Sequence, residues 1–316
     1  MSGPGKFQHE ALFYAGEPDF LGGTLPFVYA GLDAGDAVLV VVDAGKIDSM
    51  RAALSDDAHR VSFADMAEVG RNPAMIIPAW RDFLDEHGGH EGGVRGIGEP
   101  IWAERSPAEL VECQRHEALL NVAFAGGTPW RLLCPYDTAS LAPDVLRDVG
   151  HSHPLLTDIR GRQASTDYCG DGWPGADDEL PEPPGPVPRL DFGPGPLDGV
   201  RRFVAERARS VLAADELSDL LLAVTEVAGN SLEHGGGHGS LRVWRTERGA
   251  TCEIRDDGWI RDPLAGRARP GVNGDRGRGL WMANQLCDLM QLRSSAAGTV
   301  IRLHARHRAL GARHSA

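Results

Sequence analysis

Three polar residues recur at every fourth position in one short stretch of the chain. Glu226, Asn230 and His234 fall in the segment from Thr225 to His234. On a helix, such positions stack along one face, so a carboxylate, a carboxamide and an imidazole line up. Mg²⁺ prefers oxygen ligands and keeps several waters, so one amide oxygen with phosphate oxygens suffices. Taken alone, the pattern also suits a surface helix whose polar residues face water.

Two further motifs follow in order. Asp256 and Gly258 come at the end of a predicted strand, where the carboxylate can accept a hydrogen bond from an adenine amino group and glycine lets the backbone approach the base. A plain Asp-Gly turn would have the same sequence. Gly277, Gly279 and Leu280 then open a helix, whose free N–H groups can face phosphates. Candidate phosphate contacts in the preceding loop are Arg267, Arg269 and Arg276.

The elements that must position these motifs form an α+β pattern. An amphipathic stripe from Leu197 to Leu212 predicts a helix, and a second helix is predicted over 216–233. A long loop rich in Gly and Arg covers 266–277, and a helix follows over 280–288. Predicted strands are 241–245, 251–255, 289–293 and 299–303.

The first part of the chain has a different organisation. Val38 to Val42 is a continuous run of valine and leucine, as expected of a strand buried on both faces. Helical spacing follows over 46–54 and again over 107–124, and a further strand is predicted over 130–134. Strands that alternate with helices predict an α/β domain with a mostly parallel sheet.

Proline and glycine mark the boundary between these two parts. Residues 181–188 hold five prolines, which exclude a helix or a central strand and favour an extended spacer. We therefore predict a first domain over 1–165, a linker over 166–195 and a second domain over 196–310.

Bulk composition limits the function classes. The 316 residues are 42% hydrophobic and carry a formal net charge of -13, which disfavours broad binding to nucleic acid or anionic membrane. The first residues lack a signal-peptide core, and the longest apolar run, 37–42, is too short to span a bilayer. Five scattered cysteines, without a Cys-x-x-Cys pair, favour a reducing cytoplasm.

The order of the three motifs, closed by Gly298-Thr299-Val300, resembles the GHKL ATPase fold of Bergerat type over residues 190–310. The short domain and its Thr-Glu-Val-x-x-Asn-Ser-x-x-His-Gly sequence are similar to bacterial anti-sigma-factor serine/threonine kinases. That resemblance implies ATP and Mg²⁺, with Asn230 coordinating the metal and Glu226 acting as general base. It leaves His234 open between a phosphate contact and a helix end. The residues implied to bind nucleotide are Asn230, Asp256 at the adenine, Gly258, Gly277, Gly279, Leu280 and Thr299 near the adenine end.

The first domain resembles the MEDS sensory domain over residues 7–160. The similarity rests on His9 to Tyr14, on 31–40, and on the motifs around Cys134-Pro135-Tyr136-Asp137 and His153-Pro154. This implies a RecA-like core used for sensing. Gly45-Lys46 follows a strand, where a phosphate loop would lie, but Val40 and Ile47 replace the glycine and the Ser or Thr that such a loop requires.

Two other chemistries can be considered for the first domain. A zinc site could use Cys113, His116, His151 and His153, but nothing in the sequence sets their distances, and Cys113 also fits an apolar stripe. His9 and His116 each precede a glutamate, as in a histidine-kinase phosphoacceptor, but the expected proline is missing. The sequence favours neither.

The resulting expectation is a cytoplasmic protein serine/threonine kinase acting in sigma-factor partner switching. By resemblance, its partner is a sigma factor or an anti-sigma antagonist, with no direct nucleic acid and no membrane. A homodimer is usual among the similar kinases, although no interface is legible in this sequence. Two alternatives stay open: a non-catalytic, nucleotide-dependent module that sequesters its partner, and a histidine-kinase-like sensor.

Overall fold

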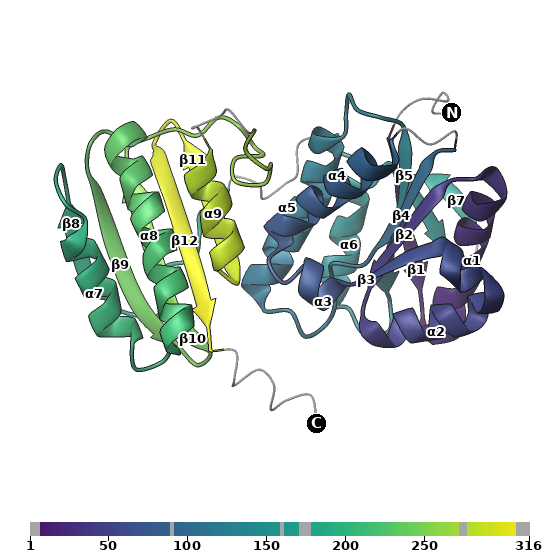
Figure 1. The fold of residues 1–316 in the computed structure, drawn as a ribbon, viewed down its shortest axis with the longest axis horizontal. Helices are drawn as coiled ribbons and strands as arrows, with labels where there is room; N and C mark the ends of the chain where they lie inside the picture. The colour runs from purple at the N-terminus through teal and green to yellow at the C-terminus, as the bar shows by residue number, and fades with distance from the viewer. Residues whose placement is uncertain (1–6, 89–91, 159–160, 171–177, 272–276, 308–316) are drawn as a thin grey trace. The chain divides into compact units, whose positions relative to one another are not determined.

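The computed structural model describes residues 7–88, 92–158, 161–170, 178–271 and 277–307. These residues form two compact units, which correspond to 1–176 and 177–316, and each unit has its own sheet (Figure 1). Within the described ranges, each helix is too short or too polar to cross a membrane.

The first unit is built on a seven-stranded sheet in the order β3-β2-β4-β5-β1-β6-β7. All neighbouring strands run parallel except β6 and β7, which are antiparallel. The predicted mostly parallel α/β sheet is therefore confirmed. The strands are β1 (Gln8–Tyr14), β2 (Ala37–Val42), β3 (Val61–Asp65), β4 (Val94–Gly98), β5 (Trp130–Asp137), β6 (Leu155–Asp158) and β7 (Gly161–Ala164).

Helices cover both faces of this sheet (Figure 1). On one face, α1 and α2 bury Phe20, Val28 and Met50 against Leu12 and Val40 of the strands. On the other face lie α4 and α5, with α6 packed against α5. The helices are α1 (Gly16–Ala34), α2 (Ala44–Leu54), α3 (Met66–Val69), α4 (Ile76–His87), α5 (Pro107–Ala123) and α6 (Pro143–Ser152), with 3₁₀ turns η1 (Ser55–Arg60) and η2 (Pro73–Met75).

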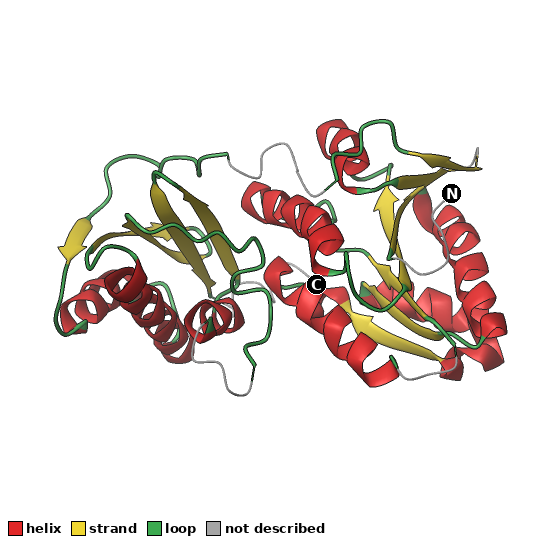
Figure 2. Ribbon diagram, turned by 90° about the horizontal axis from the view of Figure 1, so that it is seen from above, coloured by secondary structure: helices red, strands yellow, loops and turns green. Residues whose placement is uncertain are grey.

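The second unit is one antiparallel sheet with its helices on one face (Figure 2). The strand order is β11-β12-β10-β9-β8, and every neighbouring pair is antiparallel. This confirms the predicted helices and strands and adds a short strand, β8, that the sequence did not indicate. The elements are β8 (Arg189–Phe192), α7 (Asp198–Ala208), α8 (Ala214–His234), β9 (Gly239–Thr246), β10 (Gly249–Asp256), α9 (Arg278–Leu286), β11 (Leu289–Ser295) and β12 (Gly298–Arg306).

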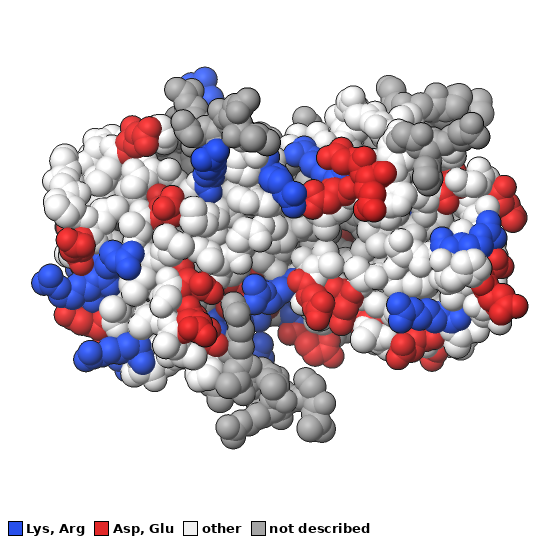
Figure 3. Space-filling model, viewed as in Figure 1, with Lys and Arg blue, Asp and Glu red and all other residues white. Residues whose placement is uncertain are grey.

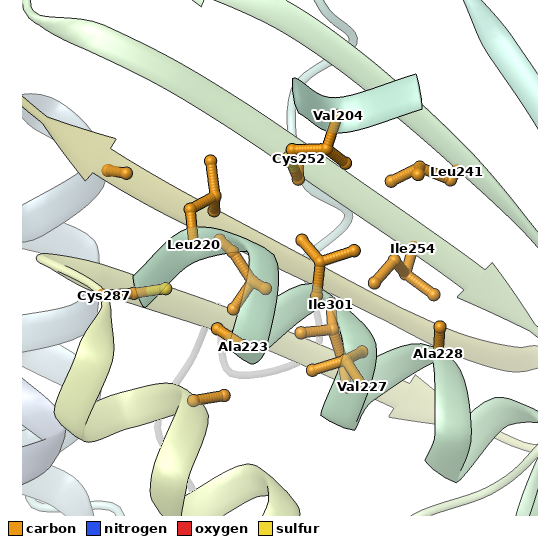
Figure 4. Close-up of a cluster of buried hydrophobic side chains, with 14 of the residues drawn as sticks. Val204, Leu220, Ala223, Val227, Ala228, Leu241, Cys252, Ile254, Cys287 and Ile301 are labelled. Carbon is orange, nitrogen blue, oxygen red and sulfur yellow. The ribbon is translucent and has the colours of Figure 1, made fainter. Parts of the chain in front are cut away.

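Alternation along the strands sorts the side chains of this sheet between its two faces. Cys252 and Ile254 of β10 point to the helices and pack with Leu220 and Val227 of α8 (Figure 4). Glu253, between them in sequence, points to the opposite face and is fully buried there. The helix-covered face therefore holds the apolar core, and the opposite face carries charged side chains.

Part of the predicted linker covers that charged face. Figure 2 shows residues 178–188 running over the side of the sheet opposite the helices. Arg302 donates to the Pro181 carbonyl at 2.8 Å, and Arg293 donates to the Asp178 carbonyl at 3.1 Å. Proline lacks an N–H but keeps its carbonyl acceptor, so a proline-rich segment can still accept bonds from arginines. Residues 178–192 thus belong to the second unit rather than to a free spacer.

Glu253 lies beneath this segment, in the middle of a group of charged side chains. Its carboxylate accepts hydrogen bonds from Arg255 at 2.7 Å and from Arg242 and Arg302. Glu182 of the covering segment pairs with Arg242 at 2.7 Å and with Arg255 at 3.2 Å. Burial alone would raise the pKa of Glu253, but the hydrogen bonds from Arg255, Arg302 and Arg242 hold that pKa below its ordinary value.

Candidate functional site

Helix α8 presents the predicted metal and base residues at the border of the core. Val224, Val227 and Ala228 are fully buried and hold the helix on the sheet. Glu226 and Asn230, on the neighbouring face, are partly buried. They therefore face the edge of the core, where a ligand can reach them, rather than open water.

The third residue of the series is placed differently. His234 is the last residue of α8, and its side chain is 59% exposed, 3.6 Å from the Glu233 carboxylate. An imidazole at a helix C-terminus is also favoured by the helix dipole. The position of His234 suits the end of a helix.

The end of β10 is tied to α8 by the predicted adenine-contacting carboxylate. Ser231, next to Asn230, donates to Asp256 Oδ2 at 2.6 Å. The Gly258 N–H donates to Asp256 Oδ1 at 2.8 Å, and Thr299 donates to the Gly258 carbonyl at 2.8 Å. Each carboxylate oxygen keeps a further lone pair. Asp256, Gly258 and Thr299 therefore form one hydrogen-bonded group that can still accept from a ligand.

The first turn of α9 lies against Glu226 and Asn230. Gly277 caps this helix with a φ of 87°, a conformation that side chains rarely adopt. A Cβ on Gly279 would lie 2.9 Å from Asn230 Nδ2 and 3.3 Å from Glu226 Oε2. Leu280 anchors the turn in the core with 8% exposure. The structure thus joins the three sequence motifs, and it places the free N–H groups of a helix start beside a carboxylate and a carboxamide.

A hollow of about 840 Å³ lies beside part of this group. Its lining includes Asp256 and Thr299 but not Glu226, Asn230 or Gly279. Size alone does not identify a nucleotide site, and the oxygen ligands and helix start that phosphates need lie outside the hollow. We therefore place the site at the meeting of α8, β10 and α9. In the preceding loop Arg267 is buried and Arg269 is exposed, whereas Arg276 lies outside the described residues.

The glycine in the first turn of α9 provides a direct test of this placement. We expect Gly279→Ala to weaken ATP binding roughly tenfold, because the new methyl group must displace Asn230 or Glu226. Gly229→Ala is the matched control, since a Cβ there meets nothing within 4 Å. It should leave affinity unchanged and stabilise α8 by about 1 kcal/mol. Calorimetric titration with ATP and Mg²⁺ measures both, and equal affinities would contradict the placement.

The first unit does not gather the four residues considered as a zinc site. Cys113 donates to the Pro100 carbonyl at 3.3 Å, and His151 lies near Asp148. Of the four, only His153 joins a group of possible ligands within the described part of the chain, and its partners there are His9, Glu117 and Cys134. The sequence gives no sign of this group, because its members are far apart in the chain and follow no common period.

The structure also places the lysine and the two histidines that the sequence analysis considered in the first domain. Lys46 Nζ pairs with Glu99 at 2.7 Å and with Asp43 at 3.0 Å. His9 and His116 are each 1% exposed. Burial, and to a smaller extent the neighbouring His153, lower the pKa of His9 to about 4 against the opposing effect of Glu117.

Family models match both parts of the chain. A model of the MEDS domain, the MEthanogen/methylotroph, DcmR Sensory domain, matches residues 8–154. A model of the histidine kinase-like ATPase domain matches residues 193–305. No curated protein matches the chain. The two matches confirm the architecture expected from the sequence, a MEDS domain followed by a GHKL-like ATPase domain.

Proposed function

We propose that this chain, with its N-terminal MEDS domain and C-terminal histidine kinase-like ATPase domain, is a protein serine/threonine kinase of sigma-factor partner switching. The ATPase domain implies ATP binding, and the MEDS domain supplies a sensory unit. In this proposal the kinase binds a sigma factor, or phosphorylates an anti-sigma antagonist, under control of the sensory domain. Its place of action is the cytoplasm.

One observation carries the kinase assignment: the first turn of α9 lies within contact distance of both Glu226 and Asn230. The amide oxygen of Asn230 suits Mg²⁺, which would screen the phosphate charges when bound. The N–H groups that start α9 suit the phosphates themselves. Glu226 is then next to the position where a seryl hydroxyl would lose its proton on attacking the γ-phosphate. A pure binding module has no need of that carboxylate.

The charge distribution supports a protein partner rather than nucleic acid. On the side of each unit drawn in Figure 3, acidic and basic side chains of the described residues are intermixed and form no basic stripe. The formal net charge is -13. Wide phosphate-backbone binding depends on clustered Lys and Arg.

The experiment that tests the proposal combines phosphate transfer with partner capture. The full chain is incubated with γ-labelled ATP, Mg²⁺ and the sigma factors and antagonist proteins of its host. We expect label on a serine or threonine of the partner. Capture that depends on ATP without transfer would instead select the sequestering module. Acid-labile label on this chain would select the histidine-kinase-like sensor, against which the burial of His9 and His116 argues.

Replacing Asn230, beside a control substitution on the same helix, tests whether its amide takes part in nucleotide binding. Asn230→Ala should weaken ATP binding in Mg²⁺ by about 10- to 100-fold, because the metal loses its protein ligand. Ser218→Ala, at an exposed position of the same helix, should leave affinity unchanged, since among the described residues this hydroxyl bonds to the Ala214 carbonyl alone. Fluorescence titration with a labelled ATP analogue measures both. Wild-type affinity in the Asn230 variant would refute its assignment as the metal ligand.

A further inference from the structure

Four side chains with metal-binding atoms meet in the interior of the first unit. His9 comes from β1, Glu117 from α5 and Cys134 from β5, and His153 directly follows α6. None is more than 1% exposed. One ligand atom from each lies within 4.8 Å of the others. These four residues are called the His9 cluster below.

The separations within the His9 cluster suit a single small cation. His9 Nε2 lies 3.0 Å from Glu117 Oε2 and 3.3 Å from Cys134 Sγ. Glu117 Oε2 is 3.5 Å from Cys134 Sγ and 3.4 Å from His153 Nε2. In a tetrahedral zinc site with bonds of about 2.0–2.3 Å, ligand atoms lie about 3.3–3.8 Å apart. Small side-chain shifts would bring all four atoms to those distances.

Hydrogen bonds to their Nδ1 atoms orient both imidazoles of the His9 cluster. His153 Nδ1 lies 2.9 Å from the Val149 carbonyl, and His9 Nδ1 lies 3.2 Å from the side-chain oxygen of Asn121. The amide nitrogen of Asn121 donates to the Ser152 carbonyl, which fixes the direction of its oxygen. With Nδ1 as donor on each ring, both Nε2 atoms are acceptors that face the cluster. Such outer hydrogen bonds are typical of histidines that bind metals.

The protein atoms alone leave this cluster incompletely satisfied. Glu117 Oε1 and His153 Nε2 are buried and have no hydrogen-bond partner among the described residues. With Nδ1 as the donor, His9 Nε2 and the Glu117 carboxylate oxygen 3.0 Å away are both acceptors, and they repel each other unless a cation or a proton lies between them. Buried polar atoms without partners are rare, because they lose water and gain nothing in return. A cation in the cluster would be the missing partner of His153 Nε2 and would balance the charge of the Glu117 carboxylate.

We propose that His9, Glu117, Cys134 and His153 bind one divalent transition-metal ion. Two imidazoles, a thiolate and a carboxylate form a mixed set that favours Zn²⁺ over Mg²⁺ or Ca²⁺, which prefer oxygen ligands alone. Binding would join β1, β5, α5 and the end of α6, so the ion would stabilise the sensory domain directly.

A catalytic use of the same residues fits the structure less well. The residue types match a thiol nucleophile (Cys134), its base (His9) and an orienting carboxylate (Glu117). However, Cys134 lies within β5 of the sheet, and its exposure is 1%. A substrate could not reach its sulfur. Four ligand atoms in a closed interior suit an ion that is bound rather than a reaction centre.

The test is metal binding by the full chain. We expect protein stripped by a chelator to take up one equivalent of Zn²⁺ and to melt at least about 5 °C higher in its first-domain transition, which ATP does not shift. With Co²⁺ as spectroscopic probe, we expect absorption typical of tetrahedral thiolate coordination. Cys134→Ser should abolish the thiolate absorption and weaken Zn²⁺ binding at least about tenfold.

Cys113→Ser is the matched control, because Cys113 is equally buried, lies on the same helix as Glu117 and is outside the cluster. It should retain the full Co²⁺ spectrum. Where Cys134→Ser does not fold, as judged by circular dichroism, His153→Gln replaces it with the same expectation. Less than about 0.1 equivalent of bound Zn²⁺, or a Co²⁺ spectrum that survives in the cluster variants, would overturn the proposal.

Discussion

Glu226→Gln is expected to lower phosphate transfer to the partner protein by about 10²- to 10⁴-fold while ATP affinity changes less than about threefold. Glutamine keeps the size and hydrogen-bonding shape of the side chain but cannot accept a proton. The carboxylate lies beside the start of α9, close enough that a Cβ on Gly279 would be 3.3 Å from it. Single-turnover transfer of labelled phosphate measures the change, and nucleotide titration shows that binding survives.

Glu233→Gln is the control for Glu226. Glu233 lies on the same helix two turns further on, and its side chain is 76% exposed. The substitution should leave both transfer and binding at wild-type values. Transfer that survives in Glu226→Gln would remove the main support for general-base catalysis, although the nucleotide site itself would stand.

The second large effect is on stability. Glu253→Gln is expected to destabilise the ATPase domain by about 3–5 kcal/mol, because three arginines lose the buried carboxylate that balances their charge. Glu182→Gln is the matched control: Glu182 pairs with two of the same arginines, but its side chain is 70% exposed. Exposed pairs contribute little. Urea unfolding of the transition that ATP stabilises compares the two, and similar midpoints would contradict a central role for Glu253.

The stability of the ATPase domain should also depend on pH through the Glu253 carboxylate. Because the folded-state pKa of Glu253 is lowered, its contribution to stability is present above the unfolded pKa of about 4.3 and is lost as pH falls through the lower folded value. Wild-type protein should therefore lose this part of its stability as the pH falls below about 4.3, whereas the Glu253→Gln variant should lack this pH-dependent loss. A variant that loses as much stability on acidification as the wild type would place the titrating group elsewhere.

The residues of the candidate nucleotide site could be proposed from the sequence because each of its parts is local. The spacing of Glu226 and Asn230 depends only on the helix period, and Asp256 and Gly279 mark the end of a strand and the start of a helix. What the sequence could not establish was that Ser231 ties Asp256 to α8, or that a Cβ at Gly279 would lie 2.9 Å from the Asn230 side chain. Those contacts depend on the packing of α8 and α9 on the sheet.

The prolines correctly predicted that their segment forms no helix, but they did not show where the segment lies. They exclude a helix between Pro181 and Pro188, and the segment forms neither helix nor strand there, with a bend at 184–185. Such a segment can be a free spacer or can lie on a surface that offers it donors. Arg242, Arg293 and Arg302 provide those donors, and they project from three different strands onto one face of the sheet. The strand alternation that puts them there is visible only once the sheet is assembled.

By itself, the sequence determined the two domains, their fold classes and the ordered motifs of the nucleotide site, because periodicity and helix-end chemistry act over a few residues. Only the tertiary structure decided which ligand atoms meet in the first domain. His9, Glu117, Cys134 and His153 lie far apart in the chain and meet because β1 and β5 are neighbours in a parallel sheet under α5. Parallel strands are joined by long crossovers, so residues that share a site need share no sequence pattern.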